Sequence, residues 1–252
     1  MQCLHMYRTA ANRGRAAIAA WPAIVCGLAL AACSDSPFDP GDRALPESVA
    51  PLAGALNPTS PTEPFDGFNS SFWYRSTHTL GRGPLVPANV TVAASQLRLG
   101  VEADGFEGAE IGTLTTFGAG AYAARLRCNA PRGALCAFFF YQPQVGDYAD
   151  EIDIEILAGT REIWFTTWVR GRRTNHVSRT LTFDPALQTH TYGIVRSGSS
   201  VAFYVDGNEL ARFRRKVPTS RMALLVNAWW PTWLAPAAAS TGSLDVDWID
   251  WS

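Results

Sequence analysis

The chain has 252 residues and nearly balanced charge, with 21 Lys and Arg against 22 Asp and Glu. This balance argues against a nucleic-acid partner, because nucleic-acid-binding domains present a basic surface. Hydrophobic residues make up 47% of the chain and aromatic residues 12%, which is enough apolar material for a sizeable core.

The first 32 residues have the pattern of a secretory signal peptide. Three arginines and no acid precede an apolar run at 16–32, which is the order of a charged region and a hydrophobic region in such signals. The run is short and is interrupted by Pro22 and Gly27, so a membrane-spanning helix is the weaker interpretation.

The apolar run ends in Leu30-Ala31-Ala32-Cys33, which resembles a bacterial lipobox. The resemblance implies that Cys33 is lipidated and becomes the first mature residue. An ordinary cleavage site after small residues is the alternative. Ser34 follows the cysteine, which in Gram-negative lipoproteins implies sorting to the outer membrane, and we therefore expect an exported protein anchored there through Cys33.

Residues 33–64 predict a disordered tether. The segment holds seven prolines and a single aromatic residue, so it cannot bury enough apolar surface to offset the entropy lost on ordering. A flexible coil of ~30 residues has a mean span of roughly 30 Å. The folded domain would then hang from the membrane on this segment.

Residues 65–252 predict one all-β domain. Short runs rich in β-branched and aromatic residues recur between Gly, Pro, Asn and Asp, a pattern typical of a sandwich of two antiparallel sheets. Asp206-Gly207 suits a type I′ hairpin turn. The runs with the clearest strand character are QLRLGV, GAYAARLR, EIWFTTWV, HTYGIV and VAFYV.

Two cysteines in this domain predict a disulfide. Cys128 and Cys136 flank a turn marked by Pro131 and Gly133, so the cysteines are expected to face each other across a hairpin. In an oxidising compartment a disulfide is favoured over two free thiols. The spacing does not resemble a metal site.

The segment ADEIDIEIL, residues 149–157, alternates acids with isoleucines. In a strand, alternate side chains point to opposite faces, so the isoleucines should face the core while Glu151, Asp153 and Glu155 form a row on the other face. Adjacent carboxylates hold at least one proton near neutral pH. A proton donor beside an anion is the pair that glycosidic cleavage requires. The alternation alone does not distinguish the ~5–5.5 Å carboxyl separation of retaining enzymes from the ~6.5–9.5 Å of inverting ones.

The segment DEIDIEIL resembles the active-site strand of glycoside hydrolase family 16, in the regular Glu-x-Asp-x-Glu form of licheninases and xyloglucan transglycosylases. The resemblance extends over most of the domain through EPFDGFNSSFW, GAYAARLR, THTYGI, FYVDG and LDVDWIDW. It implies a β-jelly roll with a concave cleft and a retaining double displacement. Glu151 would be the nucleophile, Glu155 the acid/base, and Asp153 the residue that orients Glu151.

Side chains for sugar binding are expected on the same face as the acids. Aromatic faces offer apolar contact area to sugar rings, and amides offer directional hydrogen bonds. Strand alternation places Trp164, Thr166 and Trp168 on that face, and the resemblance supports Asn227, Trp229 and Glu110. These predicted substrate-binding residues are Trp164, Thr166, Trp168, Asn227, Trp229 and Glu110.

Several positions depart from the licheninase pattern. Gly112 stands where these enzymes have Arg, Ala149 replaces a Trp, Thr166 an Asn and Trp168 a Tyr, and a Tyr and an Asn are missing near Thr79–Gly81. The resemblance therefore favours a hydrolase of β-glycans over licheninase specificity.

The family also implies a structural calcium ion on the convex side, away from catalysis. The matching positions are Pro64 and Gly100, through main-chain oxygens, and Asp247. Oxygen ligands of this kind suit Ca²⁺, although Asp247 is equally consistent with a surface acid. No cofactor is expected for catalysis.

The sequence thus predicts a monomeric retaining endo-β-glucanase that cuts β-1,3-1,4 or related glucans. A transglycosylase that remodels envelope polysaccharide is the first alternative, and Trp229, Trp230 and Trp233 favour it slightly by offering a second sugar site. A membrane-tethered, non-catalytic lectin is the second alternative. It would gain nothing from three repelling carboxylates.

Overall fold

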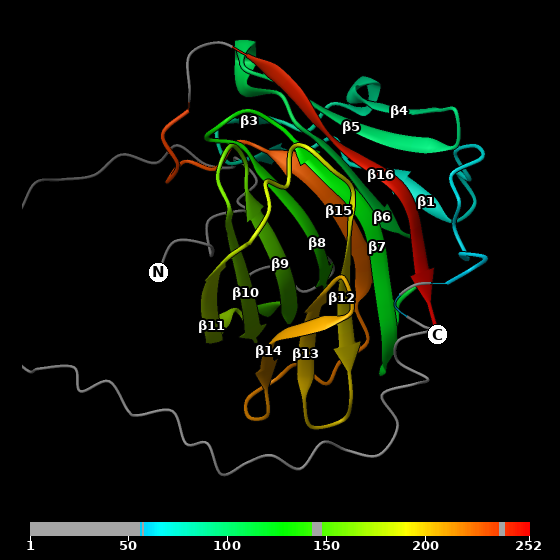
Figure 1. Cartoon of the computed structure of the whole chain (residues 1–252), viewed down its shortest axis with the longest axis vertical. Helices are drawn as coiled ribbons and strands as arrows, with labels where there is room; N and C mark the ends of the chain where they lie inside the picture. The colour runs from blue at the N-terminus through cyan, green and yellow to red at the C-terminus, as the bar shows by residue number, and fades with distance from the viewer. Residues whose placement is uncertain (1–55, 57, 143–147, 237–239) are drawn as a thin grey trace, which may run out of the picture.

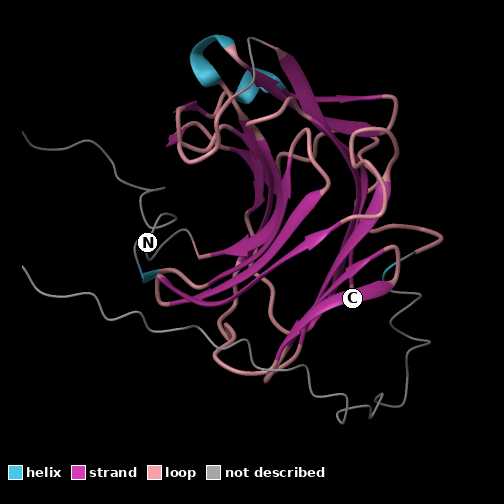
Figure 2. Ribbon diagram, turned by 60° about the vertical axis from the view of Figure 1, so that its left-hand side comes forward, coloured by secondary structure: helices cyan, strands magenta, loops and turns pink. Residues whose placement is uncertain are grey.

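A computed structural model of the chain describes residues 56, 58–142, 148–236 and 240–252. Two seven-stranded antiparallel sheets form the body of the molecule and pack on one another in two curved layers (Figures 1 and 2). The described helical turns include two short 3-10 helices, η1 (Pro87–Asn89) and η2 (Asp104–Phe106). The predicted all-β sandwich is confirmed.

The first sheet carries the predicted acidic row and is called the cleft sheet below. In spatial order its strands are β1 (Trp73–Arg75), β6 (Ala109–Thr113), β15 (Ala223–Trp229), β8 (Leu135–Tyr141), β9 (Glu151–Leu157), β10 (Glu162–Val169) and β11 (Arg172–Thr180). The acidic strand β9 is therefore held between β8 and β10, and β11 forms one edge.

The second sheet is called the back sheet. Its strands, in spatial order, are β14 (Asn208–Phe213), β13 (Val201–Val205), β12 (His190–Arg196), β7 (Gly120–Asn129), β16 (Thr241–Trp251), β5 (Gln96–Glu102) and β4 (Val90–Ala93). A separate small ribbon pairs β2 (Thr79–Leu80) with β3 (Gly83–Pro84). Asp206 and Gly207 join β13 to β14 with φ of 49° and 76°, as the predicted type I′ turn requires.

The alternation predicted for β9 is confirmed. Ile152, Ile154 and Ile156 are at most 2% exposed and pack in the core between the two sheets. A second apolar cluster lies on the opposite face of the cleft sheet and includes Phe139 and Trp229. Strands buried on both faces read as nearly continuous apolar runs, which explains the sequence LCAFFFY of β8.

The folded region begins earlier in the chain than Phe65. Glu63 pairs with Ile249 of β16, and its carboxylate accepts hydrogen bonds from the Phe65 backbone N–H at 2.9 Å and from Trp73 Nε1 at 2.8 Å. Leu56 is 2% exposed. The end of the predicted tether is thus part of the domain, because a charged side chain in it satisfies buried donors.

The remaining N-terminal predictions lie outside the described residues. They comprise the signal peptide at 1–32, lipidation of Cys33 and most of the tether at 33–64. Among the residues that the structure describes, no helix is long and apolar enough to cross a bilayer.

A disulfide joins Cys128 to Cys136, with 6.0 Å between their Cα atoms. The predicted pairing is confirmed, but the predicted hairpin is wrong. Cys128 lies on β7 of the back sheet and Cys136 on β8 of the cleft sheet. The bond therefore ties the two layers together, one strand away from the acidic row.

We expect loss of this bond to destabilise the domain. Replacing Cys128 and Cys136 together with Ala should lower the free energy of unfolding by roughly 2–3 kcal/mol, because the bridge restricts a short loop in the unfolded chain. Urea denaturation of the variant and of the oxidised wild type would measure the difference. Two alkylatable thiols in the unreduced wild type would contradict the bridge itself.

Candidate active site

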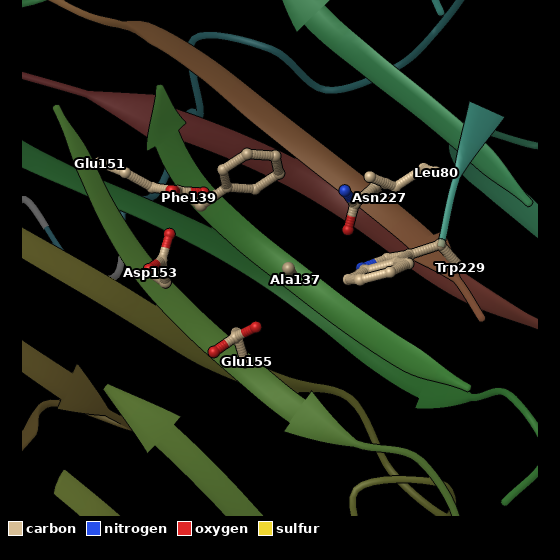
Figure 3. Close-up of a pocket in the computed structure, with 8 residues that line it drawn as sticks. All are labelled: Leu80, Ala137, Phe139, Glu151, Asp153, Glu155, Asn227 and Trp229. Atoms are coloured by element: carbon tan, nitrogen blue, oxygen red, sulfur yellow. The ribbon is translucent and has the colours of Figure 1, made fainter. Parts of the chain in front are cut away.

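The three acids of β9 lie in one row on the concave face of the cleft sheet. Figure 3 shows Glu151, Asp153 and Glu155 following one another along the strand, with Phe139 and Ala137 on the neighbouring strand β8. Asp153 is 5% exposed and Glu155 8%. The carboxyl groups are therefore largely withdrawn from water, although they line an open hollow.

Strand β10 extends this row on one side. Trp168, Thr166 and Trp164 pair in that order with the three acids of β9. Residues paired across antiparallel strands share a face of the sheet, so these three predicted sugar-binding residues lie on the cleft face. Trp168 also contacts the row directly, since its Nε1 donates to Asp153 Oδ2 at 3.1 Å.

Strands β8, β15 and β6 extend the row on the other side. Asn227 of β15 pairs with Ala137 of β8 and with Glu110 of β6. Trp229 lies two residues further along β15 and so on the same face. A small open hollow lies between these strands, and it is lined by Leu80, Ala137, Phe139, Glu151, Asp153, Glu155, Asn227 and Trp229.

Burial shifts the proton equilibria of the acidic row. It raises the pKa of Glu155 to about 7, and burial together with the charge of Glu155 raises the pKa of Glu151 to about 8. Burial and the charges of both glutamates raise the pKa of Asp153 well above its ordinary value. Because the groups interact, the protons leave the row as a set, and near neutral pH it holds both proton donors and an anion.

A hydrogen bond between Asp153 and Glu151 lowers the pKa of Glu151 and raises that of Asp153. A hydrogen bond stabilises the charged form of its acceptor and the protonated form of its donor. These directions correspond to Asp153 as the donor and Glu151 as the acceptor, the arrangement expected for a residue that orients a carboxylate nucleophile.

Glu110 is 1% exposed and is bonded at both carboxylate oxygens. Ser76 Oγ donates to one oxygen at 2.5 Å and Asn227 Nδ2 to the other at 2.9 Å. Burial nevertheless raises the pKa of Glu110. The bond fixes the amide of Asn227, whose Oδ1 has no partner among the described residues. Glu110, predicted to bind sugar, thus also positions Asn227 as an acceptor.

Tryptophans after β15 have two different roles. Trp233 stacks on Trp164 with ring centroids 5.0 Å apart and 12° between the planes, so one face of the predicted platform is covered by another indole. Trp230 is fully buried and its Nε1 donates to the Glu107 carbonyl. The suggestion that Trp230 offers a sugar site is therefore wrong. Trp230 directly follows β15, and its side chain packs in the core between the sheets.

Some cleft residues were missed from the sequence. Phe139 lines the hollow, and the alternation of LCAFFFY with β9 would have indicated it. Tyr74 of β1 lies over Gly112, where an added Cβ would come within 2.4 Å of the Tyr74 hydroxyl. The glycine that replaces the licheninase arginine thus leaves space for a tyrosine, a long-range contact with no signal in the sequence.

The residues predicted to hold calcium do not fit one ion. Gly100 pairs with Ser243 of β16. Ser243 is four residues from Asp247, so Gly100 lies ~13 Å from Asp247 along the strand direction. The carboxylate of Asp247 accepts from Gln96 Nε2 at 2.8 Å and from Arg125 Nε at 3.2 Å. Across the described ranges, no group of three or more His, Cys, Asp or Glu could hold a metal.

A jelly-roll-like sandwich with a row of interacting carboxyl groups in a hollow lined partly by aromatic residues is the arrangement expected of a glycosidase. Comparison with known proteins agrees, since a sequence model of the family described as Glycosyl hydrolases family 16 matches residues 85–250. The chain belongs to this family, and it is a glycosidase acting on O-glycosidic bonds. The lectin alternative is not favoured by this membership.

Relatives in the family include several beta-glucanases. The beta-glucanase of Bacillus subtilis is 28% identical over 192 residues, which is 72% of this chain and 79% of the relative. A lichenase structure from a mouse hindgut metagenome superposes with a TM-score of 0.71 at 25% identity, covering 75% of this chain and 97% of the lichenase. A laminarinase domain from Thermotoga petrophila reaches 0.67 at 16% identity, covering 75% and 94%. The predicted jelly roll is confirmed.

The buried acids make the stability of the fold depend on pH. Their folded pKa values lie above the ~4 of unfolded carboxyls, so the neutral forms favour folding. This contribution is fully present below about pH 4 and is lost as the pH rises through about 7 and 8. Glu151→Gln removes one titrating group and should raise the melting temperature at pH 9 more than at pH 5. Equal shifts at both pH values, measured by circular dichroism, would contradict this.

Proposed function

We propose that this chain is a retaining endo-β-glucanase that hydrolyses β-1,3-1,4 or related glucans through a glycosyl-enzyme intermediate. The observation that carries the proposal is the row of Glu151, Asp153 and Glu155 along one face of β9, lining the same hollow, with Asp153 and Glu155 buried. The beta-glucanases among its relatives support the choice of glucan. The open hollow beside the row supports attack within a chain.

In the first step Glu151 attacks the anomeric carbon. The bond from that carbon to the leaving oxygen breaks as the ester to Glu151 forms, and Glu155 transfers its proton to the leaving oxygen. The hydrogen bond from Asp153 lowers the pKa of Glu151, but burial and the charge of Glu155 still hold that pKa at about 8, above the pKa of about 7 of Glu155. In the free row the proton therefore lies more on Glu151 than on Glu155, and this mechanism requires the proton to be on Glu155 once the glycan is bound. The raised pKa of Glu155 keeps its proton available near neutral pH.

In the second step water replaces Glu151 on the sugar. Glu151 is then a neutral ester, so Glu155 loses a neighbouring negative charge and its pKa falls. Glu155 takes a proton from the water, the new bond forms at the anomeric carbon, and Glu151 leaves as a carboxylate. Two displacements at one carbon return the original anomeric configuration.

Conservative variants test these roles. Glu151→Gln should abolish turnover, because an amide cannot form the ester. Glu155→Gln should lose on the order of 10²–10⁴-fold on glucan, and much less on activated aryl glycosides, whose leaving groups need no proton. Added azide should then yield a glycosyl azide of retained configuration. Asp153→Asn should reduce kcat less than Glu151→Gln, since Asp153 orients and tunes the nucleophile.

The stereochemistry of the first product provides the decisive measurement. NMR of freshly cleaved β-glucan should show the β-anomer before mutarotation. An α-anomer would overturn the double displacement, and near-normal activity in Glu151→Gln would overturn the assignment of the row. Scoring the chain-length distribution in the same reaction separates hydrolysis from transfer to a second sugar.

We also propose that the enzyme is held at a membrane by a lipid attached to Cys33. The support is the sequence Leu30-Ala31-Ala32-Cys33 after an apolar run. Cys33→Ala should move the protein from the membrane fraction to the soluble fraction of a bacterial host, with glucanase activity per molecule unchanged. Ser34→Ala is the matched control and should stay at the membrane. Continued membrane association of Cys33→Ala would refute the lipid anchor.

A further inference from the structure

The edge strand of the cleft sheet is unusually basic. β11 reads RRTNHVSRT, with three arginines, one histidine and no acid. The side chains of Arg172 and Arg173 are exposed, and neither makes a hydrogen bond or ion pair within the part of the chain that the structure describes. Two adjacent, uncompensated cations therefore lie at one end of the cleft sheet.

An irregularity in the pairing of β10 with β11 decides which of these side chains faces the cleft. Thr167 pairs with Asn175, but Trp168 pairs with Arg173, so Thr174 is an extra residue. Residues 173 and 176 would face opposite sides of a regular strand. The bulge brings both onto one face, and bulges often re-aim a side chain beside an active site.

The bulge is held by a set of hydrogen bonds. Thr174 Oγ1 donates to the Thr167 carbonyl at 3.0 Å, and Asn175 Nδ2 donates to Thr167 Oγ1 at 2.9 Å. Asn175 Nδ2 also lies 3.1 Å from the carbonyl oxygen of Arg215. The unusual register is therefore a built feature, and the direction of Arg173 is fixed by it.

The face that Arg173 shares is the cleft face. Its partner Trp168 donates to Asp153 and pairs with Glu151 on the other side. His176 Nδ1 is 3.0 Å from Thr166 Oγ1 on the same face. Burial and the charge of Arg173 lower the pKa of His176, while the charge of Glu162 acts in the opposite direction; the effect of Arg173 agrees with its proximity to His176. Two strand spacings separate β11 from β9, or ~10 Å.

We propose that Arg173 and His176 form a subsite at the β11 end of the cleft for an anionic substituent of the glycan, a carboxylate or a sulfate ester. This inference rests on the proposed function, since it concerns a glycan that crosses the catalytic row and reaches the sheet edge. A guanidinium matches the geometry of a carboxylate or sulfate through paired N–H donors. The row of acids does not cancel this attraction, because burial keeps part of it protonated.

Edge protection is the competing explanation, because charged side chains on an edge strand prevent pairing with other chains. That role needs no particular face. Arg172 therefore provides a matched control: it is adjacent in sequence, carries the same charge and pairs with Val169, on the opposite face from Arg173. Edge protection, or a non-specific electrostatic attraction of the anionic glycan, would involve both arginines equally.

The test compares the full-length wild type, Arg173→Ala and Arg172→Ala on mixed-linkage β-glucan and on the same glucan partly carboxymethylated or partly sulfated. Arg173→Ala should lower kcat/KM on the charged substrates by roughly tenfold or more through KM, as loss of a charge-assisted contact predicts, and should leave the neutral glucan unchanged. Arg172→Ala should change neither. The carboxymethylated and sulfated arms show which anion the subsite prefers, and added salt should reduce the advantage of both.

Equal losses in the two variants, or an equal loss on neutral and charged glucan, would overturn the subsite. A binding measurement separates this from failure of the proposed function. In a Glu151→Gln background, affinity electrophoresis in gels containing each glucan should show weaker retention by carboxymethyl glucan when Arg173 is also replaced. Retention that does not depend on Arg173 overturns the inference, whereas absence of hydrolysis by the wild type overturns only the glucanase assignment.

Discussion

The alternation of β9 is the constraint on which the rest of the structure depends. One set of its side chains packs in the core and the other forms the acidic row, so the two faces of the strand cannot exchange places. A slip of one residue in its pairing would put three carboxyl groups between the sheets and three isoleucines in the cleft. Pairing with β8 and β10 along its length fixes the register, and the apolar core enforces it.

The same constraint sets a conflict between stability and activity. Buried and partly buried carboxyl groups favour their neutral forms, and every charge that catalysis places on the row opposes folding. The surrounding structure offsets this cost locally. Trp168 and the hydrogen bond between Asp153 and Glu151 support the anionic state, while the disulfide from Cys136 ties the neighbouring strand to the back sheet. Rigidity beside the row therefore comes from packing and covalent linkage.

Local patterns were sufficient for much of the fold and for the row itself, because period-two alternation and turn chemistry are written in adjacent residues. Contacts that depend on the pairing of distant segments were not predictable. The cysteines at 128 and 136 suggested a hairpin, yet they join two sheets. Tyr74 reaches Gly112 only through the pairing of β1 with β6. The bulge at Thr174 likewise has no signature in a strand of polar residues, and it reverses the face on which Arg173 lies.

The parts of the cleft therefore differ in how far their residues can be replaced without moving β9. The acidic row is central in its sheet, paired on both sides and fixed by the core beneath it. The β11 end is an edge, where one inserted residue re-aims a side chain without moving β9. On the other side, Ser76 bonds to Glu110 and Glu110 holds Asn227 through side-chain hydrogen bonds that do not involve the hydrogen bonds of β9, although the charge of Glu110 raises the pKa of Glu151. A chain built in this way can keep one catalytic arrangement while its contacts with the glycan vary, because the residues that touch the flanking sugars are not those that fix the register of the acids.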